Sequence, residues 1–160
     1  VRMLWYRADL LAAKNLKEPR TLDEVVETAK AVMTDKIVGI GIGLSRGNNA
    51  TSLMEWFIPS LRGLGSQLLH PDGSAAFNGE AGVRLLQWLQ DLVYKHKAMP
   101  AGASAWTGDN LTDMMKGGVV AMVGFSAPCS CRWAAPALGR ASSSTSLSRT
   151  PVHSALPMAP

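Results

Sequence analysis

The sequence predicts an α/β domain built in three layers, and two observations lead to this prediction. Between residues 3 and 123, short apolar runs alternate with longer stretches in which apolar residues recur at helical spacing. The chain has 160 residues, of which 47% are apolar, so it is long enough to enclose one hydrophobic core. We therefore expect one α/β unit over residues 1–125 and an irregular tail over residues 126–160.

The first part of this unit begins with a predicted strand at Met3–Tyr6 and a short helix or turn at Asp9–Ala13. Thr21 and Glu24 have the spacing of a capping box, in which each side chain bonds a free backbone N–H at the helix start. The helix that follows has an apolar face at helical spacing, made of Leu22, Val25, Val26, Ala29, Val32 and Met33. Residues 37–44 alternate Ile and Val with Gly, which predicts a buried strand that another backbone or a ligand approaches closely.

A second helix is predicted at about residues 50–64, and Pro59 should kink or split it. Its apolar stripe consists of Leu53, Phe57, Leu61 and Leu64. Leu68–Leu69 is a candidate short strand, and residues 70–73 (HPDG) have the composition of a turn.

Asn78 is a suitable N-cap for the longest predicted helix, at about residues 79–97. Its predicted core face consists of Leu85, Leu86, Leu89, Leu92 and Val93. A short helix capped by Asp109 is expected at residues 109–116, and Val119–Val123 is the last predicted strand.

The net charge of +4 comes mainly from the tail. Residues 1–125 hold 13 Lys and Arg against 12 Asp and Glu, and these alternate along the chain, so we expect no nucleic-acid partner. No stretch approaches the ~18 apolar residues of a membrane span. No apolar signal-peptide region precedes Met3, so a secreted protein would carry its signal sequence in a missing N-terminal part.

Residues 126–160 contain three arginines but no Asp, Glu, Lys, Asn, Gln, Ile, Phe or Tyr. Two hypotheses explain this composition, namely a disordered natural tail or a reading-frame shift in a GC-rich gene. The two cysteines, Cys129 and Cys131, also lie here, too close together for an unstrained bridge and without a second pair for zinc. We expect neither a metal nor a cofactor.

Two segments are candidate ligand contacts. The first lies between a Gly-rich strand end and a helix start, where open α/β sheets bind ligands, and it comprises Asn48, Asn49, Thr51, Ser52, Glu55 and Trp56. Amide, hydroxyl and carboxylate groups suit the hydroxyls of a polyol, and an indole stacks on a sugar ring. Trp106, in a Gly-rich loop, is the second candidate. The alternatives are a capping box at Ser52 and Glu55, and tryptophans that belong to the core or cover a helix end.

Residues 43–47 (GLSRG) match the Gly-x-Ser-x-Gly pattern of serine hydrolases, with Ser45 as the nucleophile. This enzymatic alternative also needs an acid and a histidine. The chain offers only His70, His96 and His153, and none has a clear base role. A Gly-rich turn after a buried strand is the explanation of the motif that we favour, and we expect no catalytic residues.

Four passages occur in the order and spacing of one known family, namely LWYRADLL (4–11), LKEPRTLDE (16–24), FNGEAGV (77–83) and KGGVVAM (116–122). In these passages the chain resembles family 1 extracellular solute-binding proteins, the carbohydrate type, of bacterial ABC importers. The resemblance covers about Met3 to Val123. At residues 124–126 (GFS) the chain departs from the Gly-x-Trp motif that usually supplies the family's stacking aromatic.

The resemblance implies a periplasmic-binding-protein-like (type II) fold, in which two α/β lobes close on a ligand. The matching passages imply most of the second lobe, so this chain is expected to be a partial lobe followed by an irregular tail. The implied function is capture of a sugar or polyol in the periplasm or outside the cell, without catalysis, by a monomer that delivers it to an ABC permease. A lipid anchor on the parent protein is compatible with this expectation.

Overall fold

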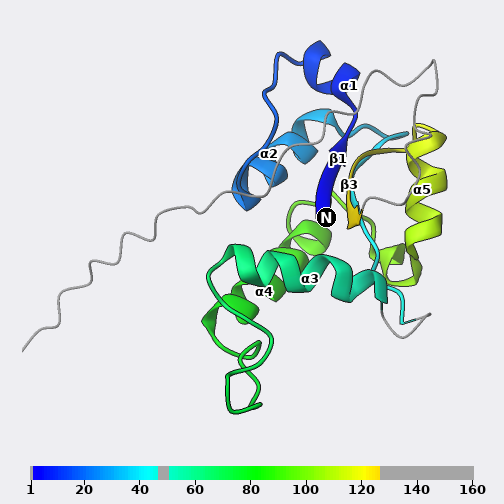
Figure 1. Cartoon of the computed structure of the whole chain (residues 1–160). Helices are drawn as coiled ribbons and strands as arrows, with labels where there is room; N and C mark the ends of the chain where they lie inside the picture. The colour runs from blue at the N-terminus through cyan, green and yellow to red at the C-terminus, as the bar shows by residue number, and fades with distance from the viewer. Residues whose placement is uncertain (1, 47–50, 127–160) are drawn as a thin grey trace, which may run out of the picture.

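The computed structural model describes residues 2–46 and 51–126, and Figure 1 shows how their helices and strands are arranged. The tail was predicted at residues 126–160, of which Ser126 is the last residue of β3 and residues 127–160 lie outside the described residues, as do the ligand candidates Asn48 and Asn49. In chain order the elements are β1 (Arg2–Tyr6), α1 (Ala8–Ala13), α2 (Leu22–Val32), β2 (Val38–Ile42), α3 (Thr51–Gly63), α4 (Glu80–Tyr94), the 3-10 helix η2 (Ala101–Ala105), α5 (Gly108–Lys116) and β3 (Val120–Ser126). The α/β prediction is therefore confirmed.

The three strands form one sheet in the order β1-β3-β2. β3 pairs with β1 in antiparallel register, with Tyr6 opposite Met122, and with β2 in parallel register, with Ile42 opposite Gly124. The last strand along the chain is thus the central strand of the sheet. Because β2 and β3 run in parallel, their carboxyl ends lie at the same end of the sheet, where α3 begins after β2.

β3 lies at the centre of the hydrophobic core. Residues 120–123 (VAMV) are all 0% exposed, which is typical of a strand covered on both faces. Helices α2, α3 and α4 share one large apolar cluster with the sheet, while α5 packs with Val120 and Val123 in a second, smaller cluster. Figure 1 shows α2 and α5 on opposite sides of the strands. The sheet therefore lies between two helical layers, as the sequence predicts.

The predicted capping box at α2 is confirmed. Thr21 accepts a hydrogen bond from the backbone N–H of Glu24 at 3.2 Å, and the Glu24 carboxylate accepts from the N–H of Thr21 at 3.2 Å. α2 then buries Val25, Ala29 and Val32, as the apolar spacing predicts. Met33 was predicted in this face, but it caps the helix with extended backbone and its side chain is 37% exposed.

The glycines of β2 allow the close approach that the sequence predicts. A Cβ atom at Gly39 would lie 2.6 Å from the Ala29 carbonyl oxygen of α2, and one at Gly41 would lie 2.6 Å from Leu111 Cδ2 of α5. The outer edge of β2 is also covered in part, because the backbone N–H of Ile40 donates to the Ala98 carbonyl at 3.2 Å. Helices α2 and α5 therefore both approach this strand closely, and Gly39 and Gly41 leave room for that packing.

Several predictions in the middle of the chain need correction. α3 is one helix across Pro59, so the helix is not split there, and a kink at Pro59 stays a prediction. The Ser60 hydroxyl donates to the Trp56 carbonyl at 2.8 Å beside the proline. Leu69 forms only an isolated bridge with Ala75 in place of a strand. Leu86 was predicted in the core face of α4, but it is 54% exposed.

The ends of α4 also differ from the prediction. Gly79, and not Asn78, is the N-cap, because its carbonyl accepts the hydrogen bond from Val83 N–H at 3.0 Å. The helix ends at Tyr94 rather than near Lys97. Lys97 adopts a left-handed backbone with φ 52°, and the next residue, Ala98, donates back into the last helical turn.

The cap of α5 is shifted in the same way. Thr107 caps the helix, because its hydroxyl accepts from the Asn110 N–H at 3.3 Å and the Asn110 side chain accepts from the Thr107 N–H at 3.0 Å. Asp109, the predicted cap, lies in the first turn. A capping box with Asn in place of Glu or Gln at its fourth position escapes the usual sequence pattern.

Arg7, where β1 leads into α1, is bonded to the segment that joins α5 to β3. Its backbone N–H donates to the Ala121 carbonyl at 2.9 Å, and its guanidinium donates to the Gly118 carbonyl at 3.2 Å and forms an ion pair with Asp9 at 2.5 Å. The turn between α5 and β3 is therefore held against the start of α1.

We predict that Gly39→Ala lowers the free energy of unfolding by about 1–3 kcal/mol, because the added methyl group collides with the backbone of α2. Gly63→Ala is the matched control, since nothing lies within 4 Å of a methyl group at that position in α3. Urea denaturation followed by circular dichroism measures both variants. Equal stabilities would contradict the close contact between α2 and β2.

The ion pair with Arg7 generates a prediction about pH. Hydrogen bonds from Arg7 hold the pKa of Asp9 below its ordinary value of 3.8. A carboxylate with a lowered pKa contributes stability above its unfolded pKa, and this contribution is lost as the pH falls through the folded pKa. Asp9→Asn should therefore destabilise the fold at neutral pH, and its difference from the wild type should shrink as the pH falls below 3.8. Denaturation at several pH values tests this, and a difference that does not change with pH would count against the ion pair.

Candidate functional site

The candidate site lies at the carboxyl ends of β2 and β3. β2 ends at Ile42, and the segment that follows, Gly43–Arg46, leads toward the start of α3 at Thr51. The backbone N–H of Ser45 donates to the carbonyl of Trp106 at 3.1 Å. This bond joins Trp106, one of the predicted ligand contacts, to the segment that precedes the other predicted contacts, although the two are far apart along the chain. Such an edge is where open α/β sheets bind ligands.

The structure describes only some of the polar residues that the sequence predicts as ligand contacts. Thr51 opens α3 with an exposed side chain, and Glu55 lies one turn later with a partly buried side chain. Ser52 lies in α3 by its backbone, while its side chain, like Asn48 and Asn49, lies outside the described residues. Thr51 and Glu55 thus lie on the first turns of the helix that follows the strand end, and the contact of this set with a ligand stays a prediction.

Trp56 is a core residue at this end of the sheet. It is 8% exposed, and its ring stacks on Trp88 of α4 with centroids 5.7 Å apart and an angle of 16° between the planes. A Cβ atom at Gly124 would lie 3.3 Å from Trp56 Cδ1, so the indole lies close to the backbone of β3 near its end. Trp56 therefore closes the core beneath the candidate site, and sugar stacking by this residue stays a prediction.

Trp88 of α4 supports Trp56 from the core side. Its indole Nε1–H donates to the Leu22 carbonyl at 3.1 Å, at the start of α2, while its ring stacks on Trp56. One side chain of α4 thus connects α2 with α3. Its place beside Leu85, Leu89 and Leu92 on the helix indicates burial, but no sequence pattern indicates the partner that it stacks on.

Trp106 lies where the two helical layers meet. Its partly buried side chain packs against both apolar clusters, and its backbone forms the C-cap of η2. Because its carbonyl also accepts the bond from Ser45, the residue is held in place from both sides. A fixed, partly exposed indole beside a strand end can present its ring to a ligand, and this role also stays a prediction.

Ser45 lies between β2 and α3, whereas the two described histidines lie before and after α4. His70 is exposed in the turn before α4, and His96 follows the end of that helix, while His153 lies outside the described residues. The described residues contain no group of three or more His, Cys, Asp or Glu side chains placed to hold a metal ion. Among the same residues, no helix has both the length and the apolar character needed to cross a membrane.

Comparisons with known proteins agree on one family. Residues 1–137 match the family model described as bacterial extracellular solute-binding protein, and this match runs past the predicted domain boundary at residue 125. That boundary stays a prediction. No curated protein matches the chain. None of the comparisons supports the serine hydrolase alternative.

Several solved structures are similar to the chain. A maltose-bound T. maritima protein, MalE3, matches with a TM-score of 0.68 and 26% identity over 78% of this chain and 32% of its own. A solute-binding protein from Thermotoga lettingae, bound with α-D-tagatose, matches with a TM-score of 0.66 and 26% identity, over 76% of this chain and 32% of its own. A solute-binding protein from Agrobacterium radiobacter K84, in complex with ribitol, matches with a TM-score of 0.67 and 25% identity, over 78% of this chain and 30% of its own. The chain spans about a third of the length of these structures.

The stacked tryptophans generate a prediction at this site. Trp88→Phe removes the donor to the Leu22 carbonyl and part of the surface that stacks on Trp56. It should lower the free energy of unfolding by about 1–3 kcal/mol. Leu86→Ala, on the exposed face of the same helix, is the control and should change it by less than about 0.5 kcal/mol. Denaturant titration compares the two, and an equal effect would show that α4 does not hold Trp56 in place.

Proposed function

The chain belongs to the bacterial extracellular solute-binding protein family, and we propose that it forms most of one lobe that closes on a sugar or polyol. The observation that supports the proposal is the hydrogen bond from the Ser45 N–H to the Trp106 carbonyl, which joins the loop of Trp106 to the segment that follows β2. The ligands named for the similar structures, maltose, tagatose and ribitol, are all polyhydroxylated. They support the choice of ligand class for this chain.

In this proposal the ligand contacts are divided by chemistry. Amide and hydroxyl groups pair with the hydroxyls of the ligand, the Glu55 carboxylate accepts from one of them, and Trp106 packs against the apolar face of the ring. The full set is Asn48, Asn49, Thr51, Ser52, Glu55, Trp56 and Trp106. One lobe covers only one side of a ligand, whereas small-molecule sites bury most of the ligand surface. Tight binding is therefore a property of the full-length protein that contains this lobe.

We further propose that the full-length protein acts outside the cytoplasmic membrane, in the periplasm or at the cell surface, as a monomer. It delivers its ligand to the permease of an ABC importer and catalyses no reaction. The family membership supports the extracellular location. We infer the permease partner and the monomeric state from ABC importers in general, in which one protein binds the solute and a separate permease transports it.

Calorimetric titration of the full-length protein with maltose, tagatose and ribitol tests the proposal. We expect one of these or a related sugar to bind, and Glu55→Gln to weaken it by about 10-fold or more, since hydrogen bonds to charged groups are the stronger ones. Glu80→Gln, at the exposed start of α4, is the matched control and should bind as the wild type does. Binding of peptides or polyamines in place of sugars, or equal affinities of the two variants, would contradict the proposal.

A further inference from the structure

Among the described residues, Asn78 is the asparagine that a glycine follows. It is exposed in the turn that leads into α4, and Gly79, the N-cap of this helix, is exposed as well. The backbone nitrogen of a residue can attack the side-chain amide of a preceding asparagine, because the two groups are held close together by the chain. Glycine has no Cβ atom to obstruct that approach. The pair is therefore open to a spontaneous chemical change.

The surroundings of Gly79 leave its backbone nitrogen accessible. The residue has extended backbone, with φ −75° and ψ −175°. Its N–H donates to the Ala76 carbonyl at 3.3 Å, which is longer than the usual range of such bonds, so this bond is weak. Outside the neighbouring residues, a Cβ atom at this position would meet only the Ala76 carbonyl oxygen, at 3.4 Å. Little protein structure therefore has to move before the nitrogen reaches the Asn78 side chain.

Asn110, in the first turn of α5, is held differently. Its side-chain oxygen accepts hydrogen bonds from the Thr107 N–H at 3.0 Å and from the Thr107 hydroxyl at 2.9 Å. The N–H of the next residue, Leu111, donates to the Thr107 carbonyl at 3.2 Å within the helix, and Leu111 is only 1% exposed. Both groups that would have to react are therefore already bonded in the folded chain.

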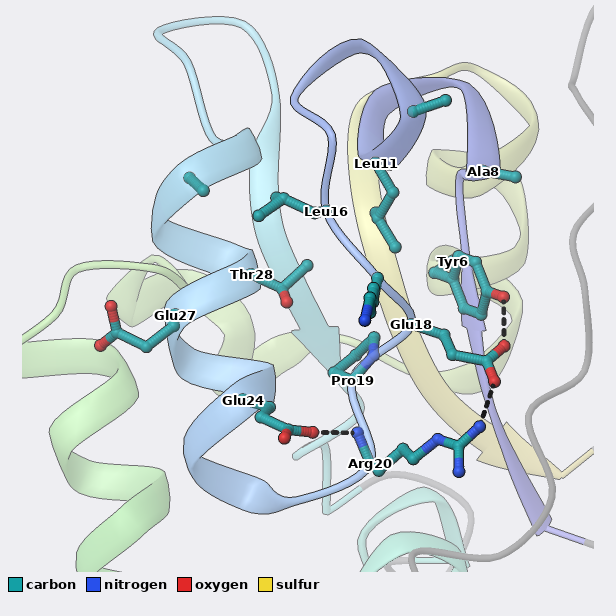
Figure 2. A pocket seen from close by; sticks show the side chains of 13 residues that line it. Tyr6, Ala8, Leu11, Leu16, Glu18, Pro19, Arg20, Glu24, Glu27 and Thr28 are labelled. Atoms are coloured by element: carbon teal, nitrogen blue, oxygen red, sulfur yellow. Dashed lines mark hydrogen bonds and ion pairs between the residues drawn. The ribbon is translucent and has the colours of Figure 1, made fainter.

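Asn15 precedes Leu16, in the segment between α1 and α2 that Figure 2 shows. The N–H of Leu16 donates to the Leu11 carbonyl at 2.9 Å, and both leucine side chains line the groove in this view. Further along the segment, Glu18 accepts a hydrogen bond from the Tyr6 hydroxyl at 3.2 Å. The short hydrogen bond and the leucine side chain both hinder attack on Asn15.

Asp72 also precedes a glycine, in the same loop as Asn78, and it is the internal comparison. The hydroxyl and the N–H of Ser74 both donate to Asp72 Oδ1, at 2.6 and 2.9 Å. These bonds hold the pKa of Asp72 below its ordinary value of 3.8, so its carboxyl group is charged at neutral pH and resists a nucleophile. The Gly73 N–H donates to the His70 carbonyl at 2.9 Å. The structure therefore suppresses ring closure at Asp72.

We propose that Asn78 converts spontaneously to aspartate and isoaspartate through a succinimide ring closed by the backbone nitrogen of Gly79. This nitrogen loses its proton to solvent base and bonds the side-chain carbonyl carbon, while the amide C–N bond breaks and its nitrogen takes up a proton and leaves as ammonia. One water molecule then opens the ring. Hydrolysis at the side-chain carbonyl gives aspartate, and hydrolysis at the main-chain carbonyl gives isoaspartate. The reaction needs only water and is independent of the proposed transport function.

Isoaspartate inserts one extra carbon atom into the main chain between residues 78 and 79, at a place where the packing is close. A Cβ atom at Gly82 would overlap the Phe77 carbonyl oxygen, so the turn before α4 lies directly against the first turn of this helix. The Gly79 carbonyl accepts the hydrogen bond from the Val83 N–H at 3.0 Å. The longer main chain therefore weakens this bond and loosens the start of α4.

Incubation of the full 160-residue chain, followed by tryptic digestion and mass spectrometry, measures the conversion. Trypsin releases residues 63–84 as one peptide, which contains both Asn78 and Asp72. We expect isoaspartate to accumulate faster at Asn78 than at Asp72, Asn15 or Asn110. One pH unit above neutral, the rate at Asn78 should rise about ten-fold, because the deprotonated fraction of a weak acid rises by this factor.

Two alanine variants test the role of Gly79. Gly79→Ala fits the extended backbone, but its methyl group obstructs the attacking nitrogen, so it should slow the conversion of Asn78. Gly63→Ala, in α3, adds a methyl group that meets nothing within 4 Å and should leave the rate unchanged. Incubation in urea separates the fold from the sequence, because loss of the bonds around Asn110 should raise its rate relative to that of Asn78.

Hydrogen exchange of aged and fresh chains tests the structural consequence. Residues 80–84 should exchange faster in the aged chain, and Gly79→Ala aged in the same way should show a smaller change. The proposal is overturned if Asn15 or Asn110 converts as fast as Asn78 in the folded chain, or if the two alanine variants behave alike. It is also overturned if urea leaves the ratio of rates unchanged, or if exchange at residues 80–84 is the same in aged and fresh chains.

Discussion

The burial of β3 between its two neighbours and two helical layers is the constraint on which the rest of the structure depends. Residues 120–123 are fully enclosed, so this strand brings the beginning of the chain, β1, into the same sheet as β2. The two layers follow, because α2 must cover one face of the strand and α5 the other. The candidate site follows as well, since the parallel pairing of β2 and β3 brings their carboxyl ends to one end of the sheet.

Local features of the fold could be predicted from the sequence, while long-range pairing could not. The Thr21–Glu24 capping box and the apolar face of α2 depend on residues within a few positions of each other, so their pattern is visible in the sequence. The pairing of Arg2 with Ser126 depends on contacts across nearly the whole described chain. The end of α4 depends on one left-handed residue, Lys97, whose conformation has no strong sequence signal because it is not a glycine.

The same distinction applies to the candidate site. The polar cluster from Asn48 to Trp56 is contiguous and was therefore open to sequence reasoning. The link between Trp106 and Ser45, which precedes this cluster, is a backbone hydrogen bond, which no side-chain pattern encodes.

Hydrogen exchange in the full-length protein, with and without a sugar that binds it, tests the central claim most directly. If this chain supplies one wall of the sugar cleft, exchange should slow at residues 43–56 and around Trp106, at the carboxyl end of β2. The segment between α1 and α2 should exchange at the same rate in both states. Slower exchange at that segment, with no change at residues 43–56, would contradict the account.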